Sequence, residues 1–478
     1  MRILIVAPYA RWLPHWETDL EIAQRHLDAG DRVTLLVCHR DLAACDPNPD
    51  HGYLRCSHCT RRQREGIRLL DGSFIVEPMI VGSDLSAMDA LPGPAIPNSL
   101  KELRDIVIDN FDLGWASLSS VVSWTGNPEP NLADADVKIT LKRAFEAGLL
   151  TYRSVRARLR AEPYDMVYVF NGRTAVTRAV VRACQAEGVP FRTHDRGCDF
   201  SHFELFENRL PQDLVSTLDA IRTAWEAGVE PERSRIGEKF FQERRLGMRQ
   251  SWVSYTGRQE AGKLPNGWDD EKSNIVVFVS SDDELVAIGE EWVNPIYRTQ
   301  AEGLEKIVGC LAGNGRHRVY IRMHPNQAGN RSAAVKRLRS LAAKNVCVIR
   351  PESPVSSYAL LDGATKVLSF GSTMGIEAAF WGRVSIVAGR SAFEGLGSTY
   401  EPSTHAEVVG LLLDTEVHPL PRAGALAYGY YEQTRGQRFR YFEGTDVWEG
   451  KFKGHRIGGG RVLEAFAKAK RLLCIGPQ

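Results

Sequence analysis

The chain has 478 residues, of which 43% are hydrophobic and 25% charged, and its formal net charge at pH 7 is +1. This length predicts two or three domains, because single cores rarely grow beyond about 300 residues. The near-neutral charge argues against a protein that coats nucleic acid, since such domains carry a basic surplus. No run approaches the ~20 apolar residues of a membrane-spanning helix, and no signal peptide is visible at residues 1–8. We therefore expect a cytoplasmic protein, with contact to the inner face of the membrane left open.

The first half of the sequence begins as a strand, a helix and a second strand. Apolar runs at 3–7 and 33–37 enclose a helical periodicity at 17–29, which Gly30 ends. This order is typical of a parallel βαβ unit. Frequent Pro, Gly, Asp and Asn then predict an irregular insertion at about 41–130. Helices are expected at 138–160, 174–187 and through most of 205–248, and strands at 166–170 and 191–194.

The second half repeats the alternation of strands and helices. A polar, turn-rich segment at 263–273 is predicted to be the linker. Strands are expected at 275–280, 319–323, 346–349, 366–370 and 384–387, with helices near 295–312, 332–343, 373–381 and 405–413. The sequence therefore predicts two Rossmann-like, doubly wound α/β domains facing a cleft, over residues 1–262 and 274–458. A helix within 459–478 is expected to pack back on the first domain.

Polar residues follow the predicted strands of the second half, where ligands bind in doubly wound sheets. The strand at 319–323 leads into His324, Pro325 and Asn326. Arg322 and His324 share one direction along an extended chain and offer donors to phosphate oxygens. A histidine satisfied in a turn beside a surface arginine is the alternative. The strand at 275–280 leads in the same way into Ser280 and Asp282, for which a solvated acidic turn is the alternative.

The strand at 366–370 leads into Gly371, Ser372 and Thr373 at the start of a helix. Free N–H groups and a partial positive charge at a helix start suit phosphate, and glycine allows close approach of the backbone. Ordinary capping by Ser372 or Thr373 is the alternative. A capping box leaves Glu377 unexplained, because the acid stands four residues after Thr373 instead of three. We expect Glu377 to accept hydrogen bonds from ribose hydroxyls.

The motifs HPN, PVSSYALL and SFGSTMGIEAAFWGRVSIV, in this order, resemble the C-terminal half of bacterial capsular-polysaccharide and related cell-surface glycosyltransferases of the GT-B fold. The resemblance covers about residues 275–415. In those families a His-Pro motif and a Ser/Thr motif bind the donor nucleotide and its phosphates. It therefore implies these roles for His324 with Pro325 and for Ser372 with Thr373, and a place near the ribose for Glu377.

Transfer with inversion needs a base that deprotonates the acceptor hydroxyl. Candidates are His15 and Glu17, which follow the first strand, and Asp195, which follows the strand at 191–194. Glu17 is equally explained as an acid in the first turn of a helix, where it complements the helix dipole. Whether transfer inverts or retains configuration stays open, as does the identity of the base.

Four of the nine cysteines stand close together in the sequence. Their spacing, C-x6-C-x10-C-x2-C, can supply four thiolates to a structural zinc ion. Free or redox-active thiols are the alternative. The residues are Cys38, Cys45, Cys56 and Cys59.

We therefore predict a glycosyltransferase that moves a sugar from a nucleotide-activated donor to a glycan or lipid-linked acceptor in surface-polysaccharide synthesis. A CDP-linked polyol-phosphate transferase and a sugar-nucleotide epimerase are the alternative enzymes, and a glycan- or nucleotide-binding subunit is the non-enzymatic alternative.

Overall fold

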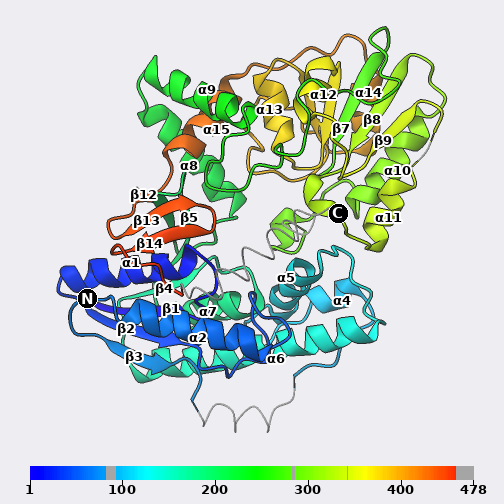
Figure 1. Ribbon diagram of the computed structural model, residues 1–478. Helices are drawn as coiled ribbons and strands as arrows, with labels where there is room; N and C mark the ends of the chain where they lie inside the picture. Colours follow the sequence, from blue (N-terminus) through cyan, green and yellow to red (C-terminus); the bar gives the residue numbers. More distant parts are fainter. Residues whose placement is uncertain (82–92, 282–285, 342, 459–478) are drawn as a thin grey trace. The chain divides into compact units, whose positions relative to one another are not determined.

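The computed structural model describes residues 1–81, 93–281, 286–341 and 343–458. These residues form two α/β units. The first comprises residues 1–211 apart from 126–128, together with the segment that begins at Arg435, and the second runs from Gln212 to Thr434 (Figure 1). In the described part of the chain, no helix combines the length and apolar character needed to cross a membrane.

The first unit is built on a seven-stranded sheet of order β12-β6-β5-β4-β1-β2-β3. Strands β5, β4, β1, β2 and β3 pair in parallel, whereas β6 is antiparallel to β5 and β12 is antiparallel to β6. Its elements are β1 (Arg2–Ala7), α1 (His15–Asp28), β2 (Arg32–Val37), α2 (Tyr53–Ile67), β3 (Ile75–Pro78), α4 (Leu100–Arg104), α5 (Leu113–Thr125), α6 (Ala135–Ala161), β4 (Met166–Phe170), α7 (Ala175–Glu187), β5 (Phe191–Arg196), β6 (His202–Glu207), β12 (Gln437–Arg438), β13 (Phe442–Asp446) and β14 (Glu449–Phe452).

The second unit is built on a five-stranded, fully parallel sheet of order β11-β10-β7-β8-β9. Its elements are α8 (Leu214–Ala227), α9 (Glu232–Arg245), β7 (Ser273–Phe278), η2 (Glu290–Trp292), α10 (Gln300–Leu311), β8 (His317–Arg322), η3 (Pro325–Gln327), α11 (Ala333–Arg339), β9 (Val346–Ile349), α12 (Ser357–Gly363), β10 (Lys366–Ser369), α13 (Met374–Phe380), β11 (Val384–Val387), α14 (His405–Leu413) and α15 (Ala423–Thr434).

Alternating side chains give the second sheet two buried faces. Ile275 and Val277 of β7 belong to a core shared with α10, α11 and α14. Val276 and Phe278 belong to the core on the other face, with α12 and Ala378 of α13. Helices on both faces of a parallel sheet define a doubly wound fold, so the predicted fold class is confirmed for this unit.

The unit boundary differs from the predicted linker. Segment 263–273 lies inside the second unit, where Trp268 stacks on Tyr320 with ring centroids 4.4 Å apart. Helices α8 and α9 also belong to this unit, because Ile221, Phe240 and Phe241 pack in one core with α13 and α15. Composition did not indicate these contacts, because α8 and α9 are highly charged and only a few of their residues are apolar and buried.

Two further predictions about the first unit need correction. The region expected to be an irregular insertion at about 41–130 contains α2, α4, α5 and the edge strand β3. The chain returns to this unit already at Arg435, where Phe439, Phe442 and Phe452 join the core beneath α1. The predicted helix within 459–478 lies outside the described residues.

Asp112 gives the first unit a testable pH dependence. Its carboxylate accepts two hydrogen bonds of 2.7 Å from Arg182 and a third from Arg178, which ties the start of α5 to α7. Burial alone would raise the pKa of Asp112, but the two arginines lower it overall. A lowered carboxyl pKa stabilises the fold above the ordinary titration range, and this contribution is lost as pH falls through the folded-state pKa.

We expect Asp112→Asn to lower the free energy of unfolding of this unit at pH 7 by about 2 kcal/mol. The difference between wild type and variant should shrink below about pH 4, where the Asp112 carboxylate of the unfolded wild-type chain takes up protons while that of the folded chain stays ionised. Calorimetric melting between pH 3 and pH 7 measures both effects. A variant penalty that stays constant over this range would show that the charge of Asp112 is not what matters.

Candidate functional site

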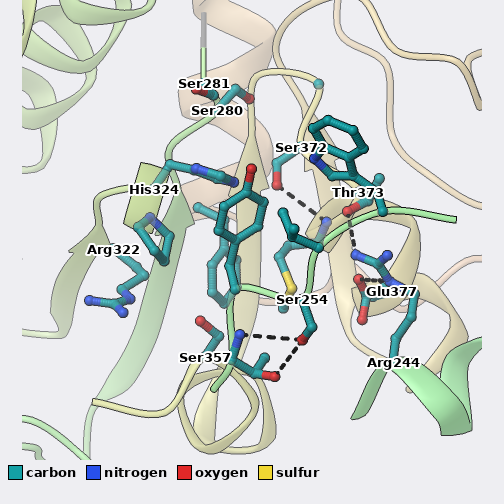
Figure 2. A pocket seen from close by; sticks show the side chains of 18 of the residues that line it. Arg244, Ser254, Ser280, Ser281, Arg322, His324, Ser357, Ser372, Thr373 and Glu377 are labelled. Atoms are coloured by element: carbon teal, nitrogen blue, oxygen red, sulfur yellow. Dashed lines mark hydrogen bonds and ion pairs between the residues drawn. The ribbon is translucent and has the colours of Figure 1, made fainter. Parts of the chain in front are cut away.

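A pocket of about 400 Å³ lies within the second unit (Figure 2). This volume falls in the range of small-molecule sites, about 300–1,000 Å³. Three of its walls are the segments that directly follow β7, β8 and β10, which supply Ser280 with Ser281, His324 with Pro325, and Gly371 with Ser372 and Thr373. The structure thus brings most of the predicted nucleotide-site residues together around one space.

The segment after β7 presents two serine hydroxyls. The Ser280 backbone N–H donates to Gln300 Oε1 (2.8 Å), while its Oγ is buried and finds no hydrogen-bond partner among the described residues. Ser281 Oγ accepts from Asn326 Nδ2 (3.2 Å), which connects this segment to the one after β8. A buried hydroxyl beside a pocket can bond to a ligand that enters it. Asp282 lies outside the described residues.

His324 caps the short helical turn η3, in which Pro325 is the first residue. Its Nδ1 accepts from the Asn326 backbone N–H (3.1 Å), and the ring stands edge-on to Tyr255 with centroids 4.8 Å apart. An Nδ1 that accepts leaves the proton of the neutral ring on Nε2. His324 is therefore a capping residue whose neutral ring carries its proton on Nε2.

Arg322 contacts the backbone of a neighbouring loop. The side chain is buried, and its guanidinium donates to the backbone carbonyls of Arg350 (2.7 Å) and Ser353 (3.2 Å). Burial lowers the pKa of Arg322 to about 10, which leaves it charged at neutral pH. These two bonds fix the loop after β9. Arg322 also lines the pocket, and its Nε is buried without a hydrogen-bond partner among the described residues, so the contact with phosphate stays a prediction.

The segment after β10 has an unusual backbone and two engaged hydroxyls. Gly371 has a φ of 113°, a conformation that side chains with a Cβ avoid. Ser372 Oγ accepts from the Met374 backbone N–H (3.3 Å), whereas Thr373, the N-cap residue of α13, makes no side-chain capping bond. Thr373 Oγ1 instead accepts from Arg244 Nη2 (3.1 Å), so Arg244 of α9 fixes this segment from outside.

Glu377 does not have the free carboxylate that the ribose prediction requires. It is fully buried, and it accepts from Arg244 Nε (2.9 Å) through Oε1 and from the Tyr358 hydroxyl (2.6 Å) through Oε2. Burial alone would lower the pKa of Arg244, but Glu377 raises it overall. Burial and then Glu377 raise the pKa of Tyr358, which stays protonated. Glu377 therefore holds α9, α12 and α13 together under the pocket.

Sequence reasoning missed Arg244 and the aromatic wall of the pocket. Arg244 is one of several charged residues in α9, and nothing in its spacing marks it as the partner of a residue 133 positions later. The wall includes aromatic residues from the second unit that lie far apart in the sequence: Trp252, Tyr255, Phe393 and Tyr428. Only the aromatic content of 252–255, just before the predicted linker, could have suggested a ligand.

In the first unit, the predicted base Glu17 is occupied by an ion pair. It is buried on α1 and accepts from the guanidinium of Arg62, which is also buried. Burial raises the pKa of Glu17 against the opposing charge of Arg62. A carboxylate held in this pair is a poor base, so the structure favours a structural role for Glu17.

His15 lies at the start of α1 with its ring on Phe170, at a centroid distance of 3.7 Å. Burial, followed by Arg196 and His194, lowers its pKa well below the ordinary value, so the ring is neutral at pH 7. Its Nδ1 is buried and has no hydrogen-bond partner among the described residues. Among the three predicted bases, Glu17 Oε2 is likewise buried without a partner among the described residues, but its carboxylate is engaged with Arg62 through Oε1, whereas the His15 ring is uncharged.

Asp195, at the end of β5, accepts from Asn171 Nδ2 (2.7 Å) and from the Arg196 backbone N–H (2.8 Å). Its neighbour His194 is fully buried and bonded through Nε2 to Asp19 Oδ1 (2.8 Å). The sequence did not indicate this His194–Asp19 pair, because its members stand 175 residues apart.

The four clustered cysteines do not form a zinc site as placed. Among the described residues, three metal-ligand atoms within 4.8 Å of one another occur only in Cys198, Asp199 and His202. Cys59 Sγ accepts from the Ala10 N–H (3.1 Å), and Cys56 Sγ from Asn48 Nδ2 (3.1 Å). Burial raises the pKa of Cys38 to about 11, which favours the thiol over the metal-binding thiolate. Zinc binding by Cys38, Cys45, Cys56 and Cys59 stays a prediction without geometric support.

Comparison with known proteins gives no matching family model and no match among curated proteins. Solved structures that align with the chain include the β-Kdo 2,4 transferase KpsC of Thermosulfurimonas dismutans (14% identity, 56% of this chain and 80% of that one, TM-score 0.38). Another is the UDP-GlcNAc 2-epimerase of Neisseria meningitidis bound to UDP-GlcNAc (12% identity, 98% and 100%, TM-score 0.25). A third is the spinosyn rhamnosyltransferase SpnG (12% identity, 91% and 96%, TM-score 0.27). Likenesses this distant leave the function to be argued from the site itself.

The two accounts of Glu377 make opposite predictions. If Glu377 is a structural residue, Glu377→Gln removes the charge partner of Arg244, whose side chain is 34% exposed. Because solvent screens the arginine in part, we expect the free energy of unfolding of the second unit to fall by about 1–2 kcal/mol. Tyr358→Phe removes one hydrogen bond from Glu377 and should cost about 1–2 kcal/mol. Calorimetric melting of both variants measures the loss. Unchanged stability of Glu377→Gln, together with weaker nucleotide binding, would restore the ribose contact instead.

Proposed function

We propose that the chain is a glycosyltransferase that transfers a sugar from a nucleotide-activated donor to a glycan or lipid-linked acceptor, in surface-polysaccharide synthesis. The pocket of the second unit binds the nucleotide. The observation that carries this proposal is the meeting of Ser280, His324 and the 371–373 segment, from three adjacent parallel strands, in one pocket of about 400 Å³.

The polar part of the pocket suits phosphate groups. His324 offers Nε2–H, and Ser280 Oγ is a buried hydroxyl without a partner among the described residues. The φ of 113° at Gly371 leaves the backbone at this point uncovered by a side chain. Donors placed on rigid post-strand loops bind phosphate oxygens with little reorganisation.

The apolar part of the pocket suits the rest of a nucleotide. Trp252, Tyr255, Phe393 and Tyr428 line it together with Met248 and Met374. Aromatic faces and flexible thioethers stack on planar rings, which a nucleobase provides. A pocket lined by both hydrogen-bonding groups and aromatic rings suits a nucleoside phosphate, which combines an anionic group with a planar base.

In this proposal the acceptor is deprotonated by a residue of the first unit, and His15 is the best supported candidate. A neutral imidazole can take the proton of the acceptor hydroxyl while that oxygen attacks the anomeric carbon of the donor and the nucleotide leaves. Asp195 is the second candidate, since its carboxylate is held in place by Asn171.

We expect one nucleotide among CMP, CDP, UDP, GDP and dTDP to raise the melting temperature of the full chain, because it binds only the folded state. His324→Ala and Ser372→Ala should each weaken its binding at least about tenfold, or about 1.4 kcal/mol. The exposed His418, which precedes Pro419 outside the pocket, provides a matched control in His418→Ala. No thermal shift with any of the five nucleotides would contradict the proposal, and so would equal losses in His324→Ala and His418→Ala.

The base is tested separately from donor binding. His15→Gln should leave nucleotide affinity within about twofold and lower turnover of sugar transfer by about 10²-fold or more, as general-base losses do. Asp195→Asn should affect turnover less. Product analysis by mass spectrometry reports transfer, and it also separates transfer from epimerisation of the donor sugar. Normal turnover in His15→Gln would remove His15 from the mechanism.

A further inference from the structure

Away from the pocket, three side chains of the second unit form a hydrogen-bonded chain that ends at the surface. His405, the first residue of α14, contacts Cys310 of α10 through Nε2 (3.5 Å from Sγ). Its Nδ1 is 2.8 Å from the hydroxyl of Tyr297, in the segment before α10. Cys310 is exposed, His405 is partly buried and Tyr297 is almost fully buried. The proposed nucleotide site uses none of the three.

Tyr297 fixes the imidazole. Its ring packs edge-on against His405, with centroids 5.8 Å apart and planes at 80°. Burial raises the pKa of Tyr297 to about 12, with a smaller contribution from Cys310, so its hydroxyl stays protonated. Its oxygen accepts from Nδ1–H of His405, which leaves Nε2 without a proton and able to take the one from Cys310. A nucleophile, a base within hydrogen-bond reach and a third group that orients the base are the recognised arrangement of an activated thiol.

A base lies beside the thiol of Cys310. His405 Nε2 is within hydrogen-bond reach of its sulfur, and a neighbouring histidine is one of the environments in which cysteines react as thiolates. Cys347 of β9 offers a contrast in the same unit, since it is only partly exposed and burial raises its pKa.

We propose that Cys310 is a nucleophilic thiol that peroxides oxidise to a sulfenic acid, with His405 as its proton acceptor. The Sγ proton moves to Nε2 of His405, and the thiolate attacks one oxygen of the peroxide. The O–O bond breaks as the S–O bond forms, so the sulfur is oxidised and the peroxide reduced. The leaving oxygen takes the proton from His405, which for hydrogen peroxide gives water and returns the neutral imidazole.

The test measures reaction rates of Cys310 in the full chain. One sample of the protein is treated with a limiting amount of hydrogen peroxide and then with dimedone, which reports the sulfenic acid. A second sample is treated with iodoacetamide. Peptide mass spectrometry then measures the extent of modification at each cysteine. Exposure alone cannot make a folded thiol react faster than the same thiol in urea. We therefore expect native Cys310 to react several-fold faster than in urea with both reagents, and native Cys347 to react more slowly than in urea.

His405→Gln should slow native Cys310 about tenfold or more with both reagents, because the proton acceptor is lost. Tyr297→Phe keeps the buried ring and removes only the orienting hydroxyl, and we expect about a threefold reduction. The rates in urea should be the same in all three proteins, which separates an effect on the fold from an effect on the thiol. The proposal is overturned if native wild-type Cys310 reacts no faster than in urea, or if both variants keep the wild-type rate.

Discussion

The parallel pairing of β7 with β8 on one side and β10 on the other is the constraint on which the candidate site depends. Phe278, the last residue of β7, pairs with Arg322 at the end of β8 and with Ser369 at the end of β10. The three strands therefore end level. Side chains that follow level parallel strands meet at one edge of the sheet. Ser280, His324 and Thr373, which stand 44 to 93 positions apart in the sequence, therefore share one pocket.

Polar groups beneath the pocket hold its walls in place, and this arrangement places charged groups away from water. Glu377 accepts hydrogen bonds from Arg244 and Tyr358, and Arg244 also donates a hydrogen bond to Thr373. A buried ion pair adds little net stability compared with apolar packing, and its geometric role here is to join α9 and α12 to the start of α13. Ser280 Oγ, which lines the pocket, is buried without a partner among the described residues. An unpaired hydroxyl next to a pocket is better explained by a ligand than by folding.

The strands of the second unit could be predicted from sequence because their apolar runs are short, β-branched and bounded by Gly, Pro and polar residues. The same periodicity located the three segments that follow β7, β8 and β10, and these segments form three walls of the pocket. The unit boundary could not be predicted, because α8 and α9 are joined to the second unit by a few apolar residues such as Phe240 and Phe241 in otherwise charged helices. The hydrogen-bond partners of Glu17, Glu377 and Asp19 could not be predicted either, because each partner lies 45 to 175 residues away in the sequence.

The residues predicted for the site therefore fall into two groups, according to whether local sequence or a distant partner determines their surroundings. A residue whose place in the pocket follows from its position after a strand, as with His324 and Ser372, can be found from local pattern. A residue whose surroundings depend on a distant partner cannot, as with Glu377, both of whose carboxylate oxygens already accept hydrogen bonds.

The central claim is that the segments after β7, β8 and β10 form one nucleotide site. Amide hydrogen exchange of the full chain, measured with and without the nucleotide that gives the largest thermal shift, tests it most directly. The account predicts that peptides covering 278–281, 322–327 and 369–377 gain protection together and at the same ligand concentration. Protection confined to one of these segments, or found only elsewhere in the chain, would contradict it.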